Sequence, residues 1–256
     1  MDNINLLLTI SYCGTNFSGW QVQPNKRTVQ GEIERALKKL FNSECDVVGS
    51  GRTDAGVHAL NAKANVLLPK EFTIKNFYNA ETKFDKLLLV LNCYLPQDVR
   101  ILKIKQVSAK FNARKSAKKK TYLYKIQNSG IASPFDYDRV YFFNKELDVD
   151  KMQQASNHLI GEHDFSSFCS SNTSVNSFVR TIYDIKIYKK SNIINFEITG
   201  NGFLYNMVRI IVGTLIDVGT NKIPPEKIKF ILEEKDRKLA GKTAPSLALY
   251  LKNVKY

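Results

Sequence analysis

The segment at residues 204–218 constrains the fold more than any other, because apolar residues surround the whole circumference of the helix that it predicts. Such a helix is buried, so other elements must cover it on every side. It contains one cation, Arg209, whose burial without an anion would be costly. The only acid of the helix, Asp217, lies about 12 Å away along the axis, so the partner of Arg209 should be distant in sequence.

A second helix is predicted at residues 28–40, with Thr28 as its N-cap. One face carries the apolar residues Val29, Ile33, Ala36, Leu37 and Leu40, and the other carries Glu32, Glu34, Lys38 and Lys39. Further helices are expected at 84–95, 150–160 and 224–234, and strands at 5–12, 46–49, 62–68, 99–107, 121–127, 179–189, 193–199 and 247–256. The elements mix without a steady βαβ rhythm, which predicts an α+β fold with a substantially antiparallel sheet.

The domain division is expected at a polar, basic segment, residues 111–120. A chain of 256 residues with 43% hydrophobic residues can form two compact parts. We expect an N-terminal subdomain at 1–112 and a C-terminal subdomain at 113–256.

Four cysteines, Cys13, Cys45, Cys93 and Cys169, are scattered without a CxxC pair, which indicates neither a zinc site nor a disulfide framework. No apolar run reaches the roughly 18 residues of a membrane span, and the first nine residues lack the features of a signal peptide. We therefore expect a cytoplasmic protein that does not enter a membrane.

The net charge of +14 indicates a polyanionic partner, with nucleic acid as the first candidate. A basic surface that is merely solvated is the alternative.

The densest chemical signal is the glycine-rich loop at residues 49–58, which places Arg52 two residues before Asp54. Glycines allow tight turns and close approach of a ligand, and an arginine can orient a carboxylate or contact a phosphate. The alternative is an ordinary turn in which Asp54 caps its own backbone.

A basic cluster from Arg114 to Lys120 runs directly into Tyr122 and Tyr124. Cations that bind phosphates beside a ring that stacks on a base are typical of an RNA site. Two tyrosines that pack on a core are the alternative. We expect Arg209 to bind either a carboxylate such as Asp54 or an RNA phosphate. The alternatives are a purely structural salt bridge or a side chain that extends to the helix edge.

No HExxH, GxxxxGK[ST] or GxGxxG motif occurs, so a metalloprotease site, nucleotide hydrolysis and dinucleotide redox chemistry are not indicated.

These motifs resemble those of the TruA-type tRNA pseudouridine synthases, along nearly the whole chain. Residues 51–58 read GRTDAGVH, the signature of that family. Residues 12–21 are similar to its YDG…GWQ segment with Cys13 in place of an acid, and 111–124 to its FHAR…YxY segment with Asn112 in place of histidine. Residues 161–168 and 202–209 resemble its GEHDFxSF and FxxxMVR segments.

The resemblance implies the pseudouridine synthase fold, two α+β halves around a long mixed sheet, and a homodimer. It implies isomerisation of uridine in the anticodon stem-loop of tRNA, at tRNA positions 38, 39 and 40, without a metal or organic cofactor. It assigns Asp54 as the catalytic residue and Tyr122 as the ring stacked on the target base. Arg52 and Arg209 are then partners of the site, and Arg114 a substrate-binding residue.

Two other functions remain open. An RNA-binding protein or tRNA folding chaperone without turnover would lack the catalytic aspartate, whereas Asp54 is present. An N-glycosidase would break the same bond and release uracil.

Overall fold

The computed structural model describes residues 4–68, 84–170 and 175–256. The chain forms two compact units: unit 1 comprises Met1–Lys118 with Leu251–Tyr256, and unit 2 comprises Lys119–Tyr250. The expected domain boundary after residue 112 stays a prediction. The boundary between the compact units falls after Lys118. The backbone N–H of Ala113 donates to Asn65 Oδ1 at 2.8 Å, and that of Lys118 donates to the Lys255 carbonyl at 2.9 Å, so residues 113–118 are tied to unit 1.

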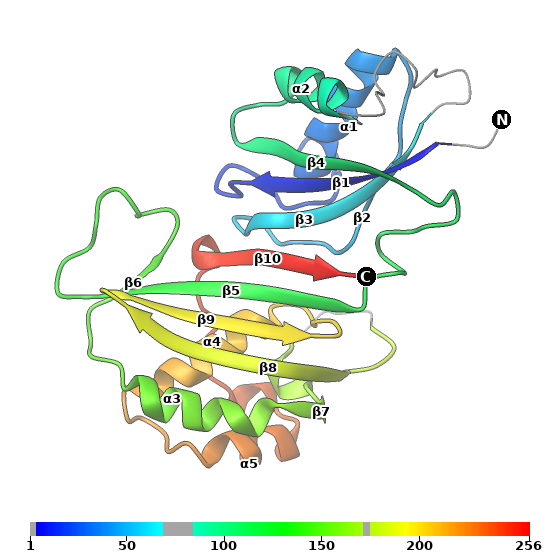
Figure 1. Cartoon of the computed structure of the whole chain (residues 1–256). Helices are drawn as coiled ribbons and strands as arrows, with labels where there is room; N and C mark the ends of the chain where they lie inside the picture. The colour runs from blue at the N-terminus through cyan, green and yellow to red at the C-terminus, as the bar shows by residue number, and fades with distance from the viewer. Residues whose placement is uncertain (1–3, 69–83, 171–174) are drawn as a thin grey trace. The chain divides into compact units, whose positions relative to one another are not determined.

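Unit 1 contains a largely antiparallel sheet with two helices (Figure 1). Its central strand β1 pairs antiparallel with β3 on one side and β4 on the other, and β2 adds to β3. The elements are β1 (Asn5–Tyr12), α1 (Val29–Phe41), β2 (Val47–Gly49), β3 (His58–Leu67), α2 (Asp85–Tyr94), β4 (Val99–Val107) and, next to β3, the greater part of β10 (Leu249–Lys255).

The core of unit 1 follows from the two-residue period of β1. Leu6, Leu8 and Ile10 are buried on one face of the strand. The buried face of α1 and the apolar side of α2, which include Ile33 and Leu87, supply further core residues. Thr28 is the N-cap of α1, as predicted, and its side chain accepts a hydrogen bond from Gly31 N.

Glu32 departs from the prediction that it faces outward, since it is 8% exposed. Its carboxylate accepts hydrogen bonds from Arg27 Nε at 3.1 Å and from an Arg35 Nη at 2.7 Å. Burial of the charge is tolerated because it is paired and hydrogen-bonded. Hydrophobic periodicity alone could not reveal these partners.

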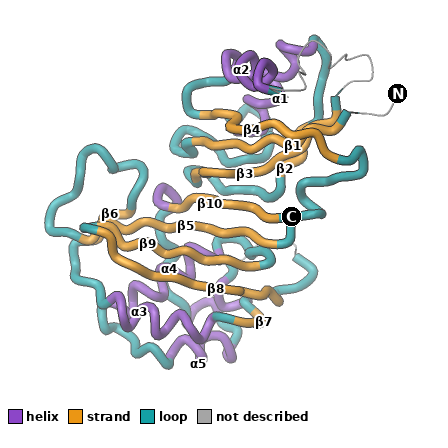
Figure 2. Tube along the Cα trace, viewed as in Figure 1, coloured by secondary structure: helices purple, strands orange, loops and turns teal. Residues whose placement is uncertain are grey.

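Unit 2 combines neighbouring strands in the order β5-β9-β8-β7 with three α-helices among the described residues (Figure 2). Those four strands are antiparallel, while β6 lies parallel to β5. The elements are β5 (Lys119–Asn128), β6 (Tyr141–Phe143), α3 (Val149–Ser156), β7 (Gly161–Asp164), β8 (Val179–Lys190), β9 (Ile193–Gly200), α4 (Met207–Gly219) and α5 (Lys227–Glu234), with short 3-10 turns at Asn157–Leu159, Ser166–Phe168, Arg237–Leu239 and Ser246–Ala248.

Helix α4 is buried on eleven of its thirteen residues, which confirms the prediction from its apolar circumference. It begins at Met207, three residues later than predicted, because Asn206 has φ 60° and interrupts the helical path. Gly213 allows the chain near Lys242 to pass directly over the helix. A Cβ at this glycine would lie 1.7 Å from the Lys242 carbonyl oxygen.

The α+β fold class with a mostly antiparallel sheet is confirmed, as is the hairpin of β8 and β9. The short strands β6 and β7 were not predicted, and the helix expected at 150–160 ends at Ser156 and continues as a 3-10 turn. Of the described helices, none has the length and apolar character to cross a membrane.

The Gly213→Ala substitution should lower the free energy of unfolding by at least about 2 kcal/mol, because the added methyl group overpacks against backbone that cannot move aside. Urea unfolding of the variant measures this. Gly130→Ala is the matched control, since its Cβ would meet no atom within 4 Å, and its stability should change by less than about 1 kcal/mol. Equal stability of the two variants would contradict the close approach at α4.

Candidate active site

The glycine-rich loop joins β2, which ends at Gly49, to β3, which begins at His58. Asp54 lies half-buried in this loop, and Arg52 is exposed. Gly56 has φ 78°, a backbone conformation that favours glycine and allows the chain to turn into β3. The loop therefore presents a carboxylate and a guanidinium between two strands of the same sheet.

Residues 12–20, which begin at the last residue of β1, are hydrogen-bonded to this loop. Tyr12 Oη and Thr53 Oγ1 form a buried hydrogen bond of 2.7 Å. Trp20 N donates to the Thr53 carbonyl at 3.0 Å, and Gly56 N donates to the Phe17 carbonyl at 3.3 Å. These bonds hold the residues on both sides of Asp54 to a segment more than thirty residues earlier in the chain. We call residues 12–20 the clasp segment.

His58 ties the end of the loop to the clasp segment. The ring is 2% exposed, and its Nδ1 accepts a hydrogen bond from Gly14 N at 3.0 Å. The sequence alone offered weak evidence for any role of His58. The structure assigns it a positioning role, as an acceptor for a backbone N–H.

Two glycines make the clasp sterically possible. A Cβ at Gly14 would lie 2.0 Å from the Val57 carbonyl oxygen. A Cβ at Gly19, which has φ 94°, would lie 2.7 Å from the Thr53 carbonyl oxygen. The backbones of the two segments are in direct contact, so any side chain at either position would push them apart.

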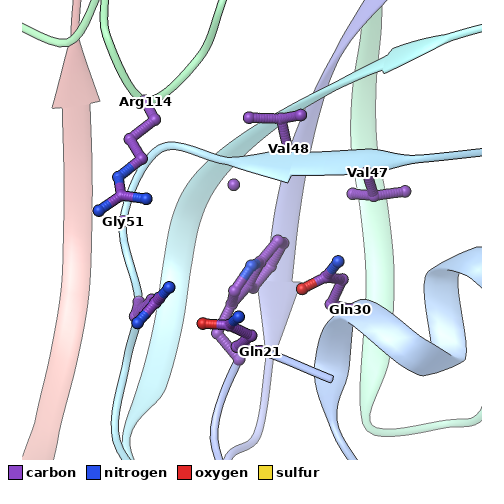
Figure 3. A pocket seen from close by; sticks show the side chains of 9 residues that line it. Gln21, Gln30, Val47, Val48, Gly51 and Arg114 are labelled. Carbon is purple, nitrogen blue, oxygen red and sulfur yellow. The ribbon is translucent and has the colours of Figure 1, made fainter. Parts of the chain in front are cut away.

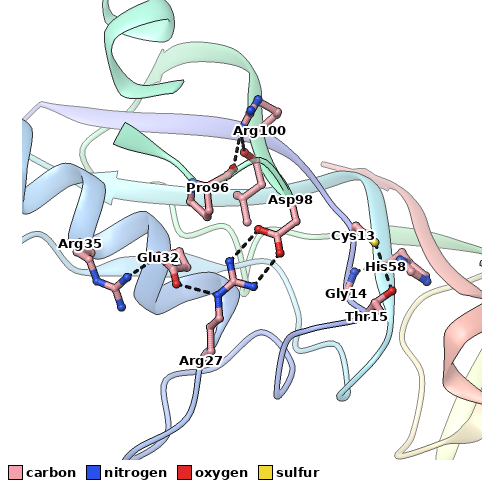
Figure 4. A network of polar contacts seen from close by, with 11 residues as sticks. Cys13, Gly14, Thr15, Arg27, Glu32, Arg35, His58, Pro96, Asp98 and Arg100 are labelled. Carbon is pink, nitrogen blue, oxygen red and sulfur yellow. Dashed lines mark hydrogen bonds and ion pairs between the residues drawn. The ribbon is translucent and has the colours of Figure 1, made fainter. Parts of the chain in front are cut away.

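An ionic network supports the clasp segment from outside (Figure 4). The Arg27 guanidinium binds both carboxylate oxygens of Asp98, at 2.7 and 2.9 Å, and donates to Glu32 at 3.1 Å. It also lies 4.1 Å from the centre of the Phe17 ring. The hydrogen bond to Asp98 is the main cause that raises the pKa of Arg27. The network holds Phe17, whose carbonyl accepts a hydrogen bond from Gly56 in the glycine-rich loop.

The two positions where the chain departs from the resembling motifs have local roles. Cys13 Sγ lies 3.3 Å from Thr15 Oγ1. Asn112 Oδ1 accepts from the backbone N–H groups of Arg114 and Lys115, each at 3.0 Å. Asn112 thereby shapes the turn from which Arg114 extends.

Tyr122 and Tyr124 lie on the same face of β5 but differ in burial. Tyr124 is fully buried, and its hydroxyl donates to the Pro245 carbonyl at 2.9 Å. Burial raises the pKa of Tyr124. Tyr122 is half-buried and packs edge-on against Phe203, with ring centres 5.1 Å apart. Tyr124 is therefore a core residue, as the alternative interpretation of the two tyrosines expected. Tyr122 is not fully buried and keeps part of its side chain accessible.

Arg209 is half-buried at the start of α4, which agrees with the alternative of a side chain that extends to the helix edge. Its Nε donates to the Ala244 carbonyl at 2.6 Å, and an Nη donates to Asn206 Oδ1 at 2.8 Å. Neutral oxygens of unit 2 thus satisfy part of the guanidinium. The anion expected for Arg209 stays a prediction.

Of the predicted site residues, Arg52, Asp54 and Arg114 lie in unit 1, and Tyr122 and Arg209 lie in unit 2. Arg52 and Arg114 share one pocket (Figure 3). All lining residues belong to unit 1: Trp20, Gln21, Gln30, Val47, Val48, Gly49, Gly51, Arg52 and Arg114. Within the described ranges, no three or more His, Cys, Asp or Glu side chains gather as a metal site, and the four cysteines are unpaired.

Comparison with known proteins identifies the family. A family profile described as tRNA pseudouridine synthase matches residues 8–114 and 155–256. The chain belongs to the tRNA pseudouridine synthase family. It is 49% identical to tRNA pseudouridine synthase A of Caldicellulosiruptor saccharolyticus, over 98% of this chain and 99% of that protein. It is 46% identical to the protein of that name from Caldicellulosiruptor bescii and 45% identical to that from Acetivibrio thermocellus, in both cases over 98% of this chain and 99% of the relative.

The buried hydrogen bond between Tyr12 and Thr53 predicts a measurable energetic coupling between these two residues. In a double-mutant cycle, Tyr12→Phe and Thr53→Val should each lower the free energy of unfolding. The pair should show a coupling of about 1 kcal/mol, because each substitution removes the same buried hydrogen bond. Strictly additive effects in urea unfolding would contradict the bond.

Proposed function

We propose that this protein isomerises uridine to pseudouridine in tRNA and that Asp54 is its catalytic residue. The observation that carries the proposal is the loop of residues 49–58, in which hydrogen bonds at Thr53 and Gly56 hold the chain on both sides of the half-buried Asp54 carboxylate. Membership of the tRNA pseudouridine synthase family supports the reaction type.

The reaction breaks the bond between C1′ of the ribose and N1 of uracil, turns the detached base, and forms a bond from C1′ to C5. The hydrogen of C5 leaves as a proton, and N1 gains a proton, so no atom is added or lost overall. The chemistry requires neither oxidant nor energy source. It does require a site that holds a reactive sugar and a free base together, away from water.

An ionised carboxylate at Asp54 can attack the base, attack the sugar or remove a proton. Each of these roles needs the charged form. A nearby guanidinium favours that form, and this is the role we propose for Arg52 and Arg209. Rigid positioning of the carboxylate adds to its reactivity, since a loop that moved freely would lose the alignment on which reaction at a single carbon depends.

Tyr122 is proposed to stack on the target base. The base must leave its helix before it can react, at a cost of a few kcal/mol. Stacking on an aromatic ring offsets about 1 to 3 kcal/mol of this cost. The contact of Tyr122 with Phe203 supports this role, because an edge-on neighbour fixes the orientation of the ring.

We further propose the anticodon stem-loop as the part of tRNA that is bound, and a homodimer as the active assembly. The net charge of +14 and the exposed side chains of Arg114, Lys115, Lys118 and Lys119 support RNA binding. Three exposed apolar side chains between β5 and β6, those of Ile131, Phe135 and Tyr137, support contact with a second copy.

Asp54→Asn should abolish pseudouridine formation, by at least about 10³-fold, while tRNA affinity stays within about threefold, because the substitution keeps the shape and removes only the charge. Nucleoside analysis of treated tRNA and a binding titration measure the two effects. Asp46→Asn, an exposed acid shortly before β2, is the matched control and should retain full activity. Turnover of Asp54→Asn near that of the wild type would refute the assignment.

Tyr122→Ala should weaken tRNA binding by about 5-fold to 100-fold and lower the rate of pseudouridine formation, because the stacking surface is lost. Tyr122→Phe keeps the ring and should retain most of the affinity. The comparison separates stacking from the hydroxyl group. Unchanged binding and rate in Tyr122→Ala would show that the ring only packs against Phe203.

A further inference from the structure

The pocket of unit 1 beside the Asp54 loop has an unusual set of polar groups (Figure 3). Its walls include the indole of Trp20, the amide of Gln21 and the guanidinium groups of Arg52 and Arg114. No aspartate or glutamate lines it. The walls therefore carry two positive charges and several hydrogen-bond donors, and no negative charge.

Trp20 is the buried member of this set, with 4% of its surface exposed. Its ring lies so close to Gly49 that a Cβ there would meet Nε1 at 2.5 Å, so the position of the ring is fixed. Among the described residues, the structure gives the indole N–H no hydrogen-bond acceptor. Because Trp20 lines the pocket, a ligand oxygen bound there could accept a hydrogen bond from this N–H.

Arg52 and Arg114 are exposed, and within the described part of the chain neither guanidinium forms an ion pair. The backbone of Arg114 is held by the turn at Asn112, and Arg52 belongs to the loop that the clasp segment holds. Both arginines line one pocket from backbones that hydrogen bonds hold, and a guanidinium can bind phosphate oxygens in bidentate fashion.

We propose that this pocket binds a phosphodiester group of the RNA strand at a nucleotide other than the one that reacts. The proposal rests on the proposed function, since it takes RNA as the substrate. Arg114 would bind the phosphate oxygens, Arg52 at the mouth of the pocket would add its positive charge, and the indole N–H of Trp20 would donate to an oxygen of the same nucleotide. Because Arg52 lies two residues before Asp54, a phosphate held here fixes the strand relative to the catalytic loop.

The test uses anticodon stem-loop RNAs that each carry one methylphosphonate, an uncharged replacement for a single phosphate. These RNAs are titrated against the wild-type protein and Arg114→Gln. At one linkage, or at two adjacent ones, the uncharged group should weaken wild-type binding at least about fivefold and Arg114→Gln binding by less than about twofold. Arg114→Gln should also flatten the slope of log K against log salt by about 0.7 to 0.9.

Two further variants complete the experiment. Trp20→Phe removes the N–H and keeps a ring, so it should weaken binding of the unmodified RNA without changing the salt slope. Lys39→Gln, an exposed cation in the last turn of α1, should leave both the slope and the methylphosphonate profile as in the wild type. If Trp20→Phe fails to fold, the exposed Arg114→Gln still decides the outcome.

An equal loss at every linkage for the wild type and Arg114→Gln, or an unchanged salt slope, would overturn the proposal. Pseudouridine formation by the wild type is measured in parallel. If the wild type forms pseudouridine but shows no linkage-specific coupling, only the pocket proposal fails. If the coupling is present but no pseudouridine forms, the proposed function fails and the phosphate site stands.

Discussion

Direct backbone contact between the clasp segment and the glycine-rich loop is the constraint on which the proposed site depends. A Cβ at Gly14 would lie 2.0 Å from the Val57 carbonyl oxygen, so no side chain fits between the two segments there. The hydrogen bonds at Thr53 and His58 can form only at this separation. Asp54 lies between these two anchors. Its position is therefore determined by residues that take no part in the chemistry.

The sheet of unit 1 places the two segments where they can meet. β1 pairs with β3 from Asn5 opposite Leu67 to Tyr12 opposite Ala59, so the end of β1 lies beside the start of β3. The clasp segment begins at the end of β1, and the glycine-rich loop leads into β3. Arg27, which is bound to Asp98 and Glu32, packs on the Phe17 ring of the clasp segment. The two parallel hydrogen bonds between this partly exposed guanidinium and the Asp98 carboxylate favour one geometry.

Much of this fold could be predicted from the sequence, because its elements follow hydrophobic periodicity. The strand at 99–107 and the N-cap at Thr28 are as predicted. The burial of Glu32 was not predicted, and the half-buried position of Arg209 was only one of several alternatives, since both depend on partners supplied by tertiary structure. The motif around Asp54 indicated a site, but not the clasp, because a hydrogen bond between Tyr12 and Thr53 has no signature in either segment alone. The joint action of Asp54 with Tyr122 and Arg209 stays a proposal.

The measurement that tests the central claim most directly uses tRNA with tritium on C5 of its uridines. Pseudouridine formation replaces the hydrogen on C5 with the bond to the ribose, so tritium must pass to water. The account predicts that the purified protein releases tritium and forms pseudouridine in equal amounts, without free uracil. Free uracil without pseudouridine would show a glycosidase, and tight tRNA binding without tritium release would show a binding protein. Either result would contradict the account.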